Sequence, residues 1–522
     1  MNIAEVLHQQ LSRRGESPAL IETRHGRDRV VTFRAFERAT ARLAALLEHK
    51  GIRAGDRVLI LHPMSIELYA FLIALFRIGA VAMFLDPSGG REYVERCLRI
   101  APPKAFFGSA KAQLLRVWIP ELRRVERTFC STHAPGATRI SLDIDGPEME
   151  TIAPALESTA ALITFTSGST GEPKAALRTH GFLLSQHRAM QAALQLQAGA
   201  FDLTTLPIFV LANLASGVTS VLPDADMRRP GSIAARPVLR QLQRLPITTM
   251  AASPAFVARL TAECRRSDLR MERMERVFLG GAPVFPDDLR RSREMFPNAE
   301  ITAVYGSTEA EPIAEIALSS ITERDFEAME GGCGLLAGAP LASIHLRIVW
   351  NRWGEPIRPF DLSEFCACCV EPGIVGEIVV SGDHVLKSYL HGQGDTETKF
   401  CAGEKVWHRT GDLGWLDPSG RLWLMGRASA AIEDERGVIY PFAVECAARQ
   451  VPSIRRAAIA SAEGRRILAV EADSRPAADA VRGRVAWAKL DEVRLVRSIP
   501  LDKRHNAKVD YVALRRAISK WK

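Results

Sequence analysis

The sequence lacks the features that mark membrane, secreted and fibrous proteins. Its most apolar stretch, residues 68–85, is interrupted by Arg77, and neither half is long enough to span a bilayer. Residues 1–22 carry Glu5 and a polar run without an apolar core, so we expect no signal peptide. No internal repeat and no low-complexity segment occurs. We therefore expect a globular protein that is not an integral membrane protein.

The cysteine content does not favour a disulfide-bonded protein, and the net charge does not favour a nucleic-acid-binding protein. Nine cysteines, an odd number spread along the chain, favour free thiols in a reducing compartment, and we predict a cytoplasmic location. The 68 basic and 60 acidic residues leave a net charge of +8 on 522 residues, and no dense basic block occurs. A charge this mild does not indicate a nucleic-acid partner.

What remains is an ordinary globular composition, 47% hydrophobic and 25% charged, on a chain long enough for roughly two to four domains. Helical spacing of apolar residues alternates with short apolar runs, and this alternation predicts a parallel, helix-covered sheet. The predicted helices cover residues 33–50 and 66–78, and the predicted strands cover residues 56–61 and 80–85.

The pattern changes twice toward the C-terminus. Residues 333–424 contain shorter strands with turns, which predicts a β-rich sub-region. A boundary falls near Gly426 and Arg427, followed by new apolar segments and an Arg-rich end. We predict an α/β fold: a large N-terminal domain, residues 1–426, of helix-covered sheets plus the β-rich sub-region, and a small α+β C-terminal domain, residues 427–522.

The sharpest motif directly follows a strand predicted over residues 161–165. It consists of Thr166, Ser167, Gly168, Ser169, Thr170, Gly171, Glu172, Pro173 and Lys174. Two glycines let the backbone bend around an anion, the hydroxyls add donors, and the lysine adds a positive charge for phosphate. The spacing is not that of a Walker A loop, and the alternative is a flexible surface turn.

Three weaker motifs follow in order along the chain. Tyr305, Gly306, Ser307, Thr308 and Glu309 come after an apolar strand. A tyrosine ring can stack on a purine, while a threonine hydroxyl and a carboxylate can hold phosphate and a hard cation. The alternative is a strand-to-loop turn with an exposed glutamate.

The third motif spans residues 407–427 and the fourth spans residues 500–508. In the third, Asp412 can accept hydrogen bonds from both hydroxyls of a ribose and Arg427 can assist. The alternative is a β-hairpin with a turn at residues 418–420. The fourth motif carries Lys508 and by itself is a basic surface loop.

Taken together and in this order, the four motifs resemble the adenylate-forming superfamily of acyl-CoA synthetases, luciferases and peptide-synthetase adenylation domains. Within it, the likeness is strongest to the β-lactone synthetases of olefin biosynthesis. The supporting segments are residues 55–59, 206–209, 281–284, 407–427 and above all the run Arg504-His505-Asn506-Ala507-Lys508. Most acyl-CoA synthetases carry a Thr-x-x-Gly-Lys pattern in the last place.

The resemblance implies a role for each motif. The run from Thr166 to Lys174 would wrap the β- and γ-phosphates of ATP, and Thr308 would touch the α-phosphate while Glu309 holds Mg²⁺. Lys508 would be carried by the C-terminal domain as a lid and would reach the carboxylate and α-phosphate. The remaining implied nucleotide contacts are Gly281, Ala282 and Pro283 along the adenine, Tyr305, Gly306 and Ser307 beside it, and Asp412 and Arg427 at the ribose.

The implied reaction is adenylation of a carboxylic acid with an apolar chain, with ATP and Mg²⁺ as cofactors. For a β-lactone synthetase the acid is a long-chain 2-alkyl-3-hydroxy acid, whose 3-hydroxyl displaces AMP without CoA. The alternative is a fatty acyl-CoA or acyl-carrier-protein ligase, which forms a thioester. A third hypothesis, a non-catalytic relative, is opposed by the joint presence of Lys174, Glu309, Asp412 and Lys508. Relatives in olefin pathways also suggest a complex with neighbouring enzymes.

Several positions depart from the family pattern or admit two interpretations. Ala175 stands where the superfamily usually has glycine, and Ser429 stands where many members carry an Asp or Lys hinge. The run Cys366-Ala367-Cys368-Cys369 lacks the layout of a zinc site, and we predict a reduced, exposed loop. His180 either lines the pocket or caps and packs a helix. The acyl pocket is predicted near Phe209, Leu211 and Leu214.

Overall fold

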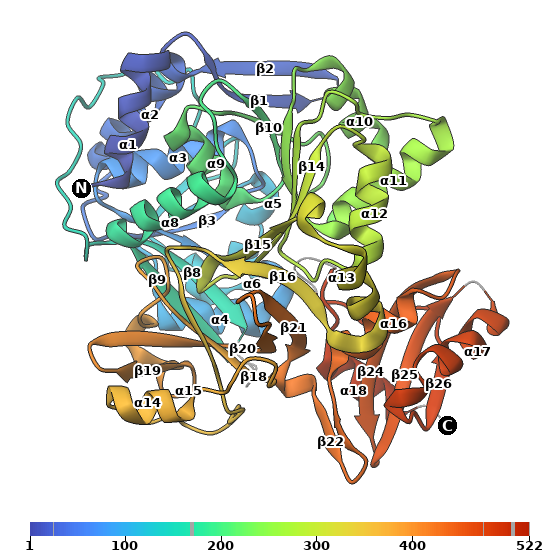
Figure 1. The fold of residues 1–522 in the computed structure, drawn as a ribbon. Helices are drawn as coiled ribbons and strands as arrows, with labels where there is room; N and C mark the ends of the chain where they lie inside the picture. The colour runs from blue at the N-terminus through green and yellow to red at the C-terminus, as the bar shows by residue number, and fades with distance from the viewer. Residues whose placement is uncertain (25, 168–171, 473, 503–506, 521–522) are drawn as a thin grey trace. The chain divides into compact units, whose positions relative to one another are not determined.

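The computed structural model describes residues 1–24, 26–167, 172–472, 474–502 and 507–520. The chain divides into two compact units, which are described separately (Figure 1). Unit 1 comprises Met1–Met227, Ala234–Ala251 and Asp383–Asp395. Unit 2 comprises Arg228–Ile233, Ala252–Gly382 and Thr396–Lys522.

A seven-stranded sheet forms the centre of unit 1, in the order β7-β6-β5-β3-β4-β8-β9. Every pair in it is parallel except the β8–β9 hairpin, which confirms the predicted parallel sheet. Its strands are β3 (Arg57–Leu61), β4 (Val81–Phe84), β5 (Ala105–Gly108), β6 (Arg127–Cys130), β7 (Thr138–Arg139), β8 (Ala160–Ser167) and β9 (Pro173–Thr179).

A second group of strands in unit 1 is also largely parallel. Strand β10 pairs in parallel with β11 and β12, β11 pairs in parallel with β1, and β1 and β2 form an antiparallel hairpin. Their bounds are β1 (Pro18–Arg24), β2 (Arg27–Thr32), β10 (Phe201–Thr204), β11 (Thr219–Leu222) and β12 (Thr249–Ala252).

The helices predicted over residues 33–50 and 66–78 are α2 (Phe33–His49) and α3 (Ile66–Arg77). The Thr32 and Ser65 side chains cap them by accepting backbone hydrogen bonds in the first turn. Every residue of α3 is buried, which explains its apolar sequence. The other helices of unit 1 are α1 (Ile3–Arg14), α4 (Arg91–Ile100), α5 (Ala110–Gln113), α6 (Leu115–Trp118), α7 (Pro120–Arg123), α8 (His180–Ala193), α9 (Pro207–Ser216) and α10 (Ala235–Arg244).

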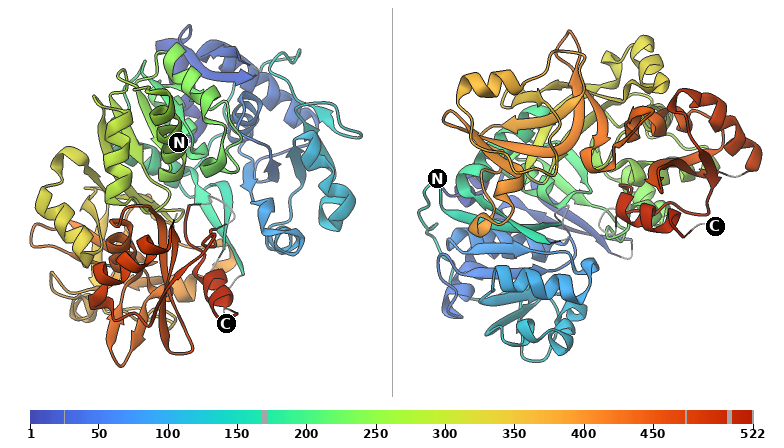
Figure 2. Two further views of the ribbon diagram at one scale, coloured as in Figure 1. Left: turned by 90° about the vertical axis from the view of Figure 1, so that its right-hand side faces the viewer. Right: turned by 90° about the horizontal axis from the view of Figure 1, so that it is seen from below.

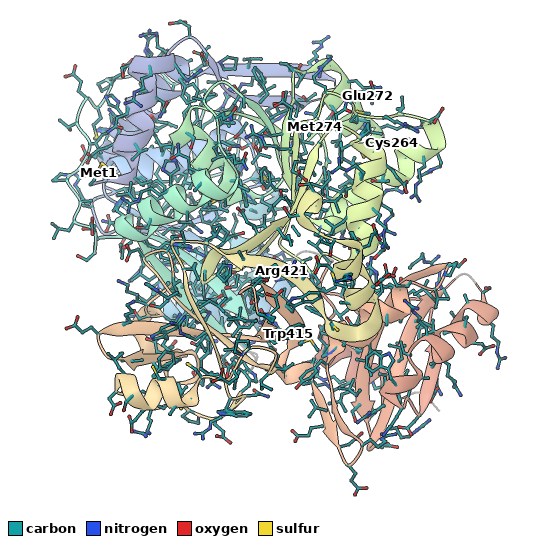
Figure 3. All side chains as sticks on the ribbon, in the orientation of Figure 1. Met1, Cys264, Glu272, Met274, Trp415 and Arg421 are labelled. Atoms are coloured by element: carbon teal, nitrogen blue, oxygen red, sulfur yellow. The ribbon has the colours of Figure 1, made fainter. Side chains whose placement is uncertain are left out.

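Unit 2 contains the predicted β-rich region. Strand β13 pairs in parallel with β14, and the strands β14-β15-β16-β21-β20-β18-β17 then follow with antiparallel pairing, with β19 beside β20. Trp415 and Arg421 mark the β20–β21 hairpin (Figure 3). The strands are β13 (Arg276–Leu279), β14 (Glu300–Ser307), β15 (Ala310–Ala317), β16 (Leu335–Pro340), β17 (His345–Val349), β18 (Gly376–Ser381), β19 (Lys399–Ala402), β20 (Lys405–Leu416) and β21 (Leu422–Arg427). The helices are α11 (Pro254–Ser267), α12 (Pro286–Met295), α13 (Glu323–Ala328), α14 (Leu362–Cys368) and α15 (Asp395–Thr398).

The C-terminal part of unit 2 is a small α+β domain, as predicted, drawn in orange-red to red in Figures 1 and 2. Its three-stranded sheet has apolar clusters built around Leu468 and Ala469, successive residues that face opposite sides of β25. The elements are β22 (Ile432–Asp434), β23 (Gly437–Ile439), α16 (Pro441–Arg449), β24 (Ile454–Ala462), β25 (Arg465–Ala472), α17 (Arg475–Arg484), β26 (Glu492–Leu495) and α18 (Tyr511–Ile518). The exact boundary after Gly426 stays a prediction.

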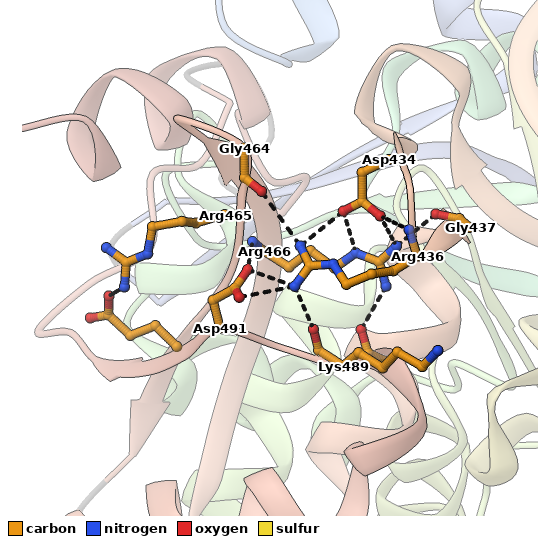
Figure 4. A network of polar contacts seen from close by, with 10 residues as sticks. Asp434, Arg436, Gly437, Gly464, Arg465, Arg466, Lys489 and Asp491 are labelled. Carbon is orange, nitrogen blue, oxygen red and sulfur yellow. Dashed lines mark hydrogen bonds and ion pairs between the residues drawn. The ribbon is translucent and has the colours of Figure 1, made fainter.

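An ion-pair network joins the β22–β23 hairpin to that sheet (Figure 4). The Arg466 guanidinium donates to both carboxylate oxygens of Asp434, at 2.8 and 2.6 Å, and to the carbonyls of Ala488 and Gly437. Arg436 donates to Asp434 and to Asp491. Arg466 is 1% exposed, so its charge is neutralised and its donors are used within the domain.

No helix among the described residues is long and apolar enough to cross a membrane. The nine cysteines are free thiols, and Cys97, Cys130, Cys264 and Cys446 are buried.

Candidate active site

The predicted phosphate motif belongs to the β8–β9 hairpin of unit 1. Thr166 pairs with Lys174 and Ser167 pairs with Pro173, so both ends of the motif are strand rather than loop. Gly168, Ser169, Thr170 and Gly171 lie outside the described residues. The hairpin places the hydroxyl-bearing end of the motif directly opposite its lysine.

Two residues that the sequence analysis missed hold Lys174. Its side chain is buried, 8% exposed, and its ammonium nitrogen lies 5.6 Å from the centroid of the Tyr389 ring. A Cβ atom placed on Gly394, whose φ is +98°, would lie only 2.4 Å from Cδ of Lys174. Residue 394 must therefore be glycine for the lysine to lie where it does. Tyr389 is fixed in turn by a backbone bridge to Ala176 on β9.

The motif from Tyr305 to Glu309 forms the β14–β15 hairpin of unit 2. Strand β14 continues through Gly306 to Ser307, which pairs with Ala310, so Thr308 and Glu309 form the turn. The Tyr305 hydroxyl donates to Oδ2 of Asp412 at 2.8 Å. Burial, followed by the Asp412 charge, raises the Tyr305 pKa well above its ordinary value, so the hydroxyl stays a donor.

Asp412 and Arg427 face each other across strands β20 and β21, where their backbones pair. Nη1 of Arg427 donates to Oδ1 of Asp412 at 3.2 Å and to the Thr410 carbonyl at 2.9 Å. The Arg427 side chain is 50% exposed, and its Nε and Nη2 make no hydrogen bond to a described residue. Asp412 is the main reason that the Arg427 pKa is raised. The pair therefore offers acceptors and donors to a diol such as ribose.

Lys508 belongs to unit 2, like Asp412 and Arg427. Asp502 fixes its backbone: the Asp502 amide donates to the Lys508 carbonyl at 2.8 Å, and the Lys508 amide donates to Oδ1 of Asp502 at 3.0 Å. Burial and then the Arg427 charge lower the Lys508 pKa, while Asp412 opposes the shift. The charges of Arg427 and Asp412 thus both act on the Lys508 ammonium group, in opposite directions. Residues 503–506 lie outside the described part of the chain.

The predicted adenine segment runs beside strand β14. Gly281 has a φ of +76°, and a Cβ atom on Gly280 would lie 3.1 Å from the Val304 carbonyl. Ala282 and Pro283 are half-buried. The Oγ atom of Ser307 is buried and has no hydrogen-bond partner among the described residues. A buried donor left unpaired is costly, so a polar group bound beside Ser307 would be favoured.

The chain matches the AMP-binding enzyme family over residues 7–390, about three quarters of its length. It belongs to this family. It is an adenylate-forming enzyme, and the superfamily resemblance of its four motifs is confirmed.

Two relatives are named olefin beta-lactone synthetase, from Stenotrophomonas maltophilia and Xanthomonas campestris pv. campestris. They are 32% and 30% identical to this chain, each covering 92% of it and 90% of the relative. An amide bond synthetase from Marinactinospora thermotolerans has the same fold, with a TM-score of 0.80, 22% identity and 99% of both chains covered. So does an O-succinylbenzoate coenzyme A synthetase from Bacillus subtilis, solved with ATP and magnesium: TM-score 0.76, 23% identity and 98% of both chains. These likenesses confirm the predicted fold class.

Other predicted features have structural roles. His180 is fully buried, Nδ1 accepts from the Ile3 amide at 3.2 Å, and burial lowers its pKa to about 4. The packing interpretation is therefore correct, while Thr179 caps the helix. The Ala175 methyl is buried in a core cluster with Phe165. Leu211 and Leu214 likewise belong to a hydrophobic core, and the acyl pocket near them stays a prediction.

The cysteine cluster is helical rather than a loop, while Cys366 is exposed, as predicted. Cys366 and Cys368 lie in α14, and the Cys369 thiol donates to the Phe365 carbonyl. Among the described residues, no group of three or more His, Cys, Asp or Glu side chains could hold a metal ion. The structure thus describes no zinc site around these cysteines.

The residues just before Asp412 support it from within the core. Arg409 and Glu377 form an ion pair at 2.7 Å in which both side chains are 1% exposed. His408 lies 3.0 Å from the Lys399 ammonium, and burial together with that charge lowers the His408 pKa to about 3. A neutral histidine and a fully paired arginine fix strand β20 at the point where it presents Asp412.

Proposed function

We propose that this enzyme adenylates a long-chain 2-alkyl-3-hydroxy acid with ATP and then closes the acyl adenylate to a β-lactone. In the first step a carboxylate oxygen bonds to the α-phosphorus and pyrophosphate leaves. In the second step the 3-hydroxyl oxygen bonds to the activated carbonyl carbon, the hydroxyl proton is lost and AMP leaves. The acid, ATP and Mg²⁺ are thus the proposed ligands, and CoA is not required.

The observation that carries the adenylation step is the group formed by Tyr305, Asp412, Arg427 and Lys508. It combines a hydroxyl, a carboxylate, a half-exposed guanidinium and an ammonium group within one unit. Displacement at phosphorus needs positioning and charge stabilisation more than proton transfer. Asp412 and Arg427 would hold the ribose, Tyr305 would pack on the adenine, and Lys508 would offset the charge that develops at the α-phosphate.

The donor set also fits the phosphates and the metal. Glu309, at the β14–β15 turn, would hold Mg²⁺, which supplies positive charge for the phosphate oxygens, and Thr308 would contact the α-phosphate. A single carboxylate suits Mg²⁺, since this ion keeps water and substrate phosphates as its other ligands. In unit 1, buried Lys174 would neutralise the outer phosphates that the motif from Thr166 to Gly171 binds.

Two observations support the lactone-forming step. The chain is 32% identical over 92% of its length to a relative named olefin beta-lactone synthetase. Ser429 also stands where many superfamily members carry an Asp or Lys hinge, which suits an enzyme that works with one lid position. Attack by a hydroxyl of the same molecule gains from proximity and requires a site that excludes water. The cytoplasmic location and a complex with neighbouring pathway enzymes stay predictions.

A thioester-forming ligase is the second candidate. It is favoured by the shared fold of the coenzyme A synthetase from Bacillus subtilis. Such an enzyme makes the same acyl adenylate, so the two candidates differ in which nucleophile displaces AMP.

Mass spectrometry of one reaction separates the candidates. Purified protein is incubated with ATP, Mg²⁺ and a long-chain 2-alkyl-3-hydroxy acid, with and without CoA. We expect a product equal to the acid minus one water, formed equally well without CoA. A CoA thioester would assign the protein to the ligases. The absence of both AMP and product would argue against this acid as the substrate.

A further inference from the structure

Helix α16 of the C-terminal domain is in contact with three different parts of unit 2. At its start, Pro441 lies 3.2 Å from the place where a Cβ atom on Gly426 would stand. In its middle, the buried Glu445 accepts a hydrogen bond from the Tyr511 hydroxyl at 2.7 Å. At its end, Arg449 is bonded to helix α12, which lies outside the C-terminal domain. The helix thus connects the domain boundary, the segment after Lys508 and the preceding part of the unit.

The Arg449 end combines ion pairs with a contact to an aromatic ring. Its side chain is 10% exposed, and Nη2 donates to Asp287 at 2.7 Å and to Asp288 at 3.2 Å. The centre of the guanidinium lies 3.9 Å from the centroid of the Phe285 ring. The two acids stand in the first turn of α12 and Arg449 in the last turn of α16, so the helix dipoles favour each charge. We refer to this group as the α12–α16 contact.

The same helix is tied to the segment that carries Lys508. Tyr511, which binds Glu445, is the first residue of α18 and follows Lys508 by three positions. Farther along α18, Arg515 donates to the carbonyl of Ser429 at 2.6 Å. A shift of α16 relative to α12 would therefore displace the segment that carries Lys508.

We propose that Arg449 is a positioning residue: the α12–α16 contact holds the C-terminal domain in the orientation in which Lys508 serves the adenylation step. This inference rests on the proposed role of Lys508. Phe285 follows the predicted adenine segment, Gly281 to Pro283, by two residues, so the contact also borders the predicted nucleotide site. Arg449 itself touches no predicted substrate atom and acts through the placement of Lys508.

A double-mutant cycle tests the inference through the rate of pyrophosphate release at saturating ATP and acid. We expect Arg449→Ala to lower kcat on the order of 10²-fold, with little change in the KM for ATP, because misplacement by about an ångström has such an effect. In the Lys508→Ala background the same substitution should cause no further loss. Arg449→Lys, which keeps the charge, should recover part of the rate.

Arg465→Ala is the matched control, since Arg465 forms an exposed ion pair with Glu492 in the same domain and should leave the rate unchanged. If Arg449→Ala does not yield folded protein, Asp287→Asn weakens the same contact more gently and takes its place in the cycle. An equal loss in both backgrounds would overturn the inference and leave the proposed function standing. An unchanged rate in Lys508→Ala alone would overturn both.

Discussion

Arg427 and Arg466 are both arginines paired with an aspartate in unit 2, but they differ in what remains for a ligand. Arg466 donates to Asp434 and to two carbonyls and is 1% exposed (Figure 4). Arg427 bonds through one nitrogen, is 50% exposed, and lies in a group that includes Asp412 and Lys508. Residue type alone does not separate a structural arginine from a binding one, whereas the number of unused donors does.

The largest effect should come from the charge closest to the reaction. Lys508→Ala should lower the rate of pyrophosphate release by about 10²–10³-fold, since it removes a cation that stabilises the transition state. The fold should persist, because Asp502 binds the backbone of residue 508 rather than its side chain. Pyrophosphate release at saturating ATP measures the loss, with thermal unfolding as the control. An unchanged rate would show that Lys508 does not act on the substrate and would contradict its grouping with Arg427.

Asp412→Ala should have the next largest effect. The substitution removes an acceptor for ribose hydroxyls and leaves Tyr305 and Arg427 without their partner. A hydrogen bond to a charged group contributes about 1.5–3 kcal/mol, so kcat/KM for ATP should fall by about ten- to a hundredfold. Steady-state kinetics with ATP varied measures this. The assignment would be wrong if kcat/KM for ATP stayed the same while stability fell.

Arg466→Ala should affect stability and leave ATP kinetics unchanged. It leaves Asp434 without its bidentate partner and the Ala488 and Gly437 carbonyls without a donor. We expect the free energy of unfolding to fall by about 2 kcal/mol, because four bonds of a buried guanidinium are lost. Calorimetry measures the change, and Arg436→Ala, at a side chain that is 30% exposed, should cost less. A raised KM for ATP in folded Arg466→Ala would show that Arg466, like Arg427, affects ATP binding, and would contradict its assignment as a structural arginine.

The smallest effect is the change in stability between pH 7 and pH 8. Burial raises the pKa of Glu445 to about 8, while the Tyr511 hydroxyl and the Arg449 charge act in the opposite direction. The native state therefore holds a proton that the unfolded chain loses near its ordinary pKa of 4.5, and stability falls as pH rises from there through about 8. We expect a decline of about 1 kcal/mol per unit near pH 7–8 that Glu445→Gln removes. Denaturation curves measured at several pH values test this prediction. It would be contradicted if the free energy of unfolding of the two proteins changed with pH in the same way.

Local patterns in the sequence predict much of this fold. Helices α2 and α3 and the strands around them follow from apolar spacing and from the caps at Thr32 and Ser65, which are short-range effects. The residues at which strands end are harder to predict from local patterns. Strands β8 and β14 extend to Ser167 and Ser307, inside motifs predicted to follow a strand, because pairing with the following strand continues that far.

Contacts between distant residues are the part that the sequence does not reveal. Arg449 and Asp287 are 162 positions apart, and each is an ordinary residue for a helix end, so neither stands out in the sequence. Gly394 and Tyr389, which hold Lys174, also lie outside any motif. The motifs did indicate Tyr305, Asp412 and Arg427. The bond between Asp412 and Arg427 depends on the pairing of β20 with β21, and the bond between Tyr305 and Asp412 joins two strands that are not neighbours in the sheet.

Helix α3, whose twelve residues are all buried, provides an internal reporter for unit 1. Its amide hydrogens exchange with solvent deuterium mainly when the surrounding core opens, since the residues of the helix are at most 8% exposed in the folded state. Their exchange rate therefore measures the opening of the core around α3. Following these amides by mass spectrometry while variants are made in unit 2 would show, without any activity assay, whether the two units unfold together or independently.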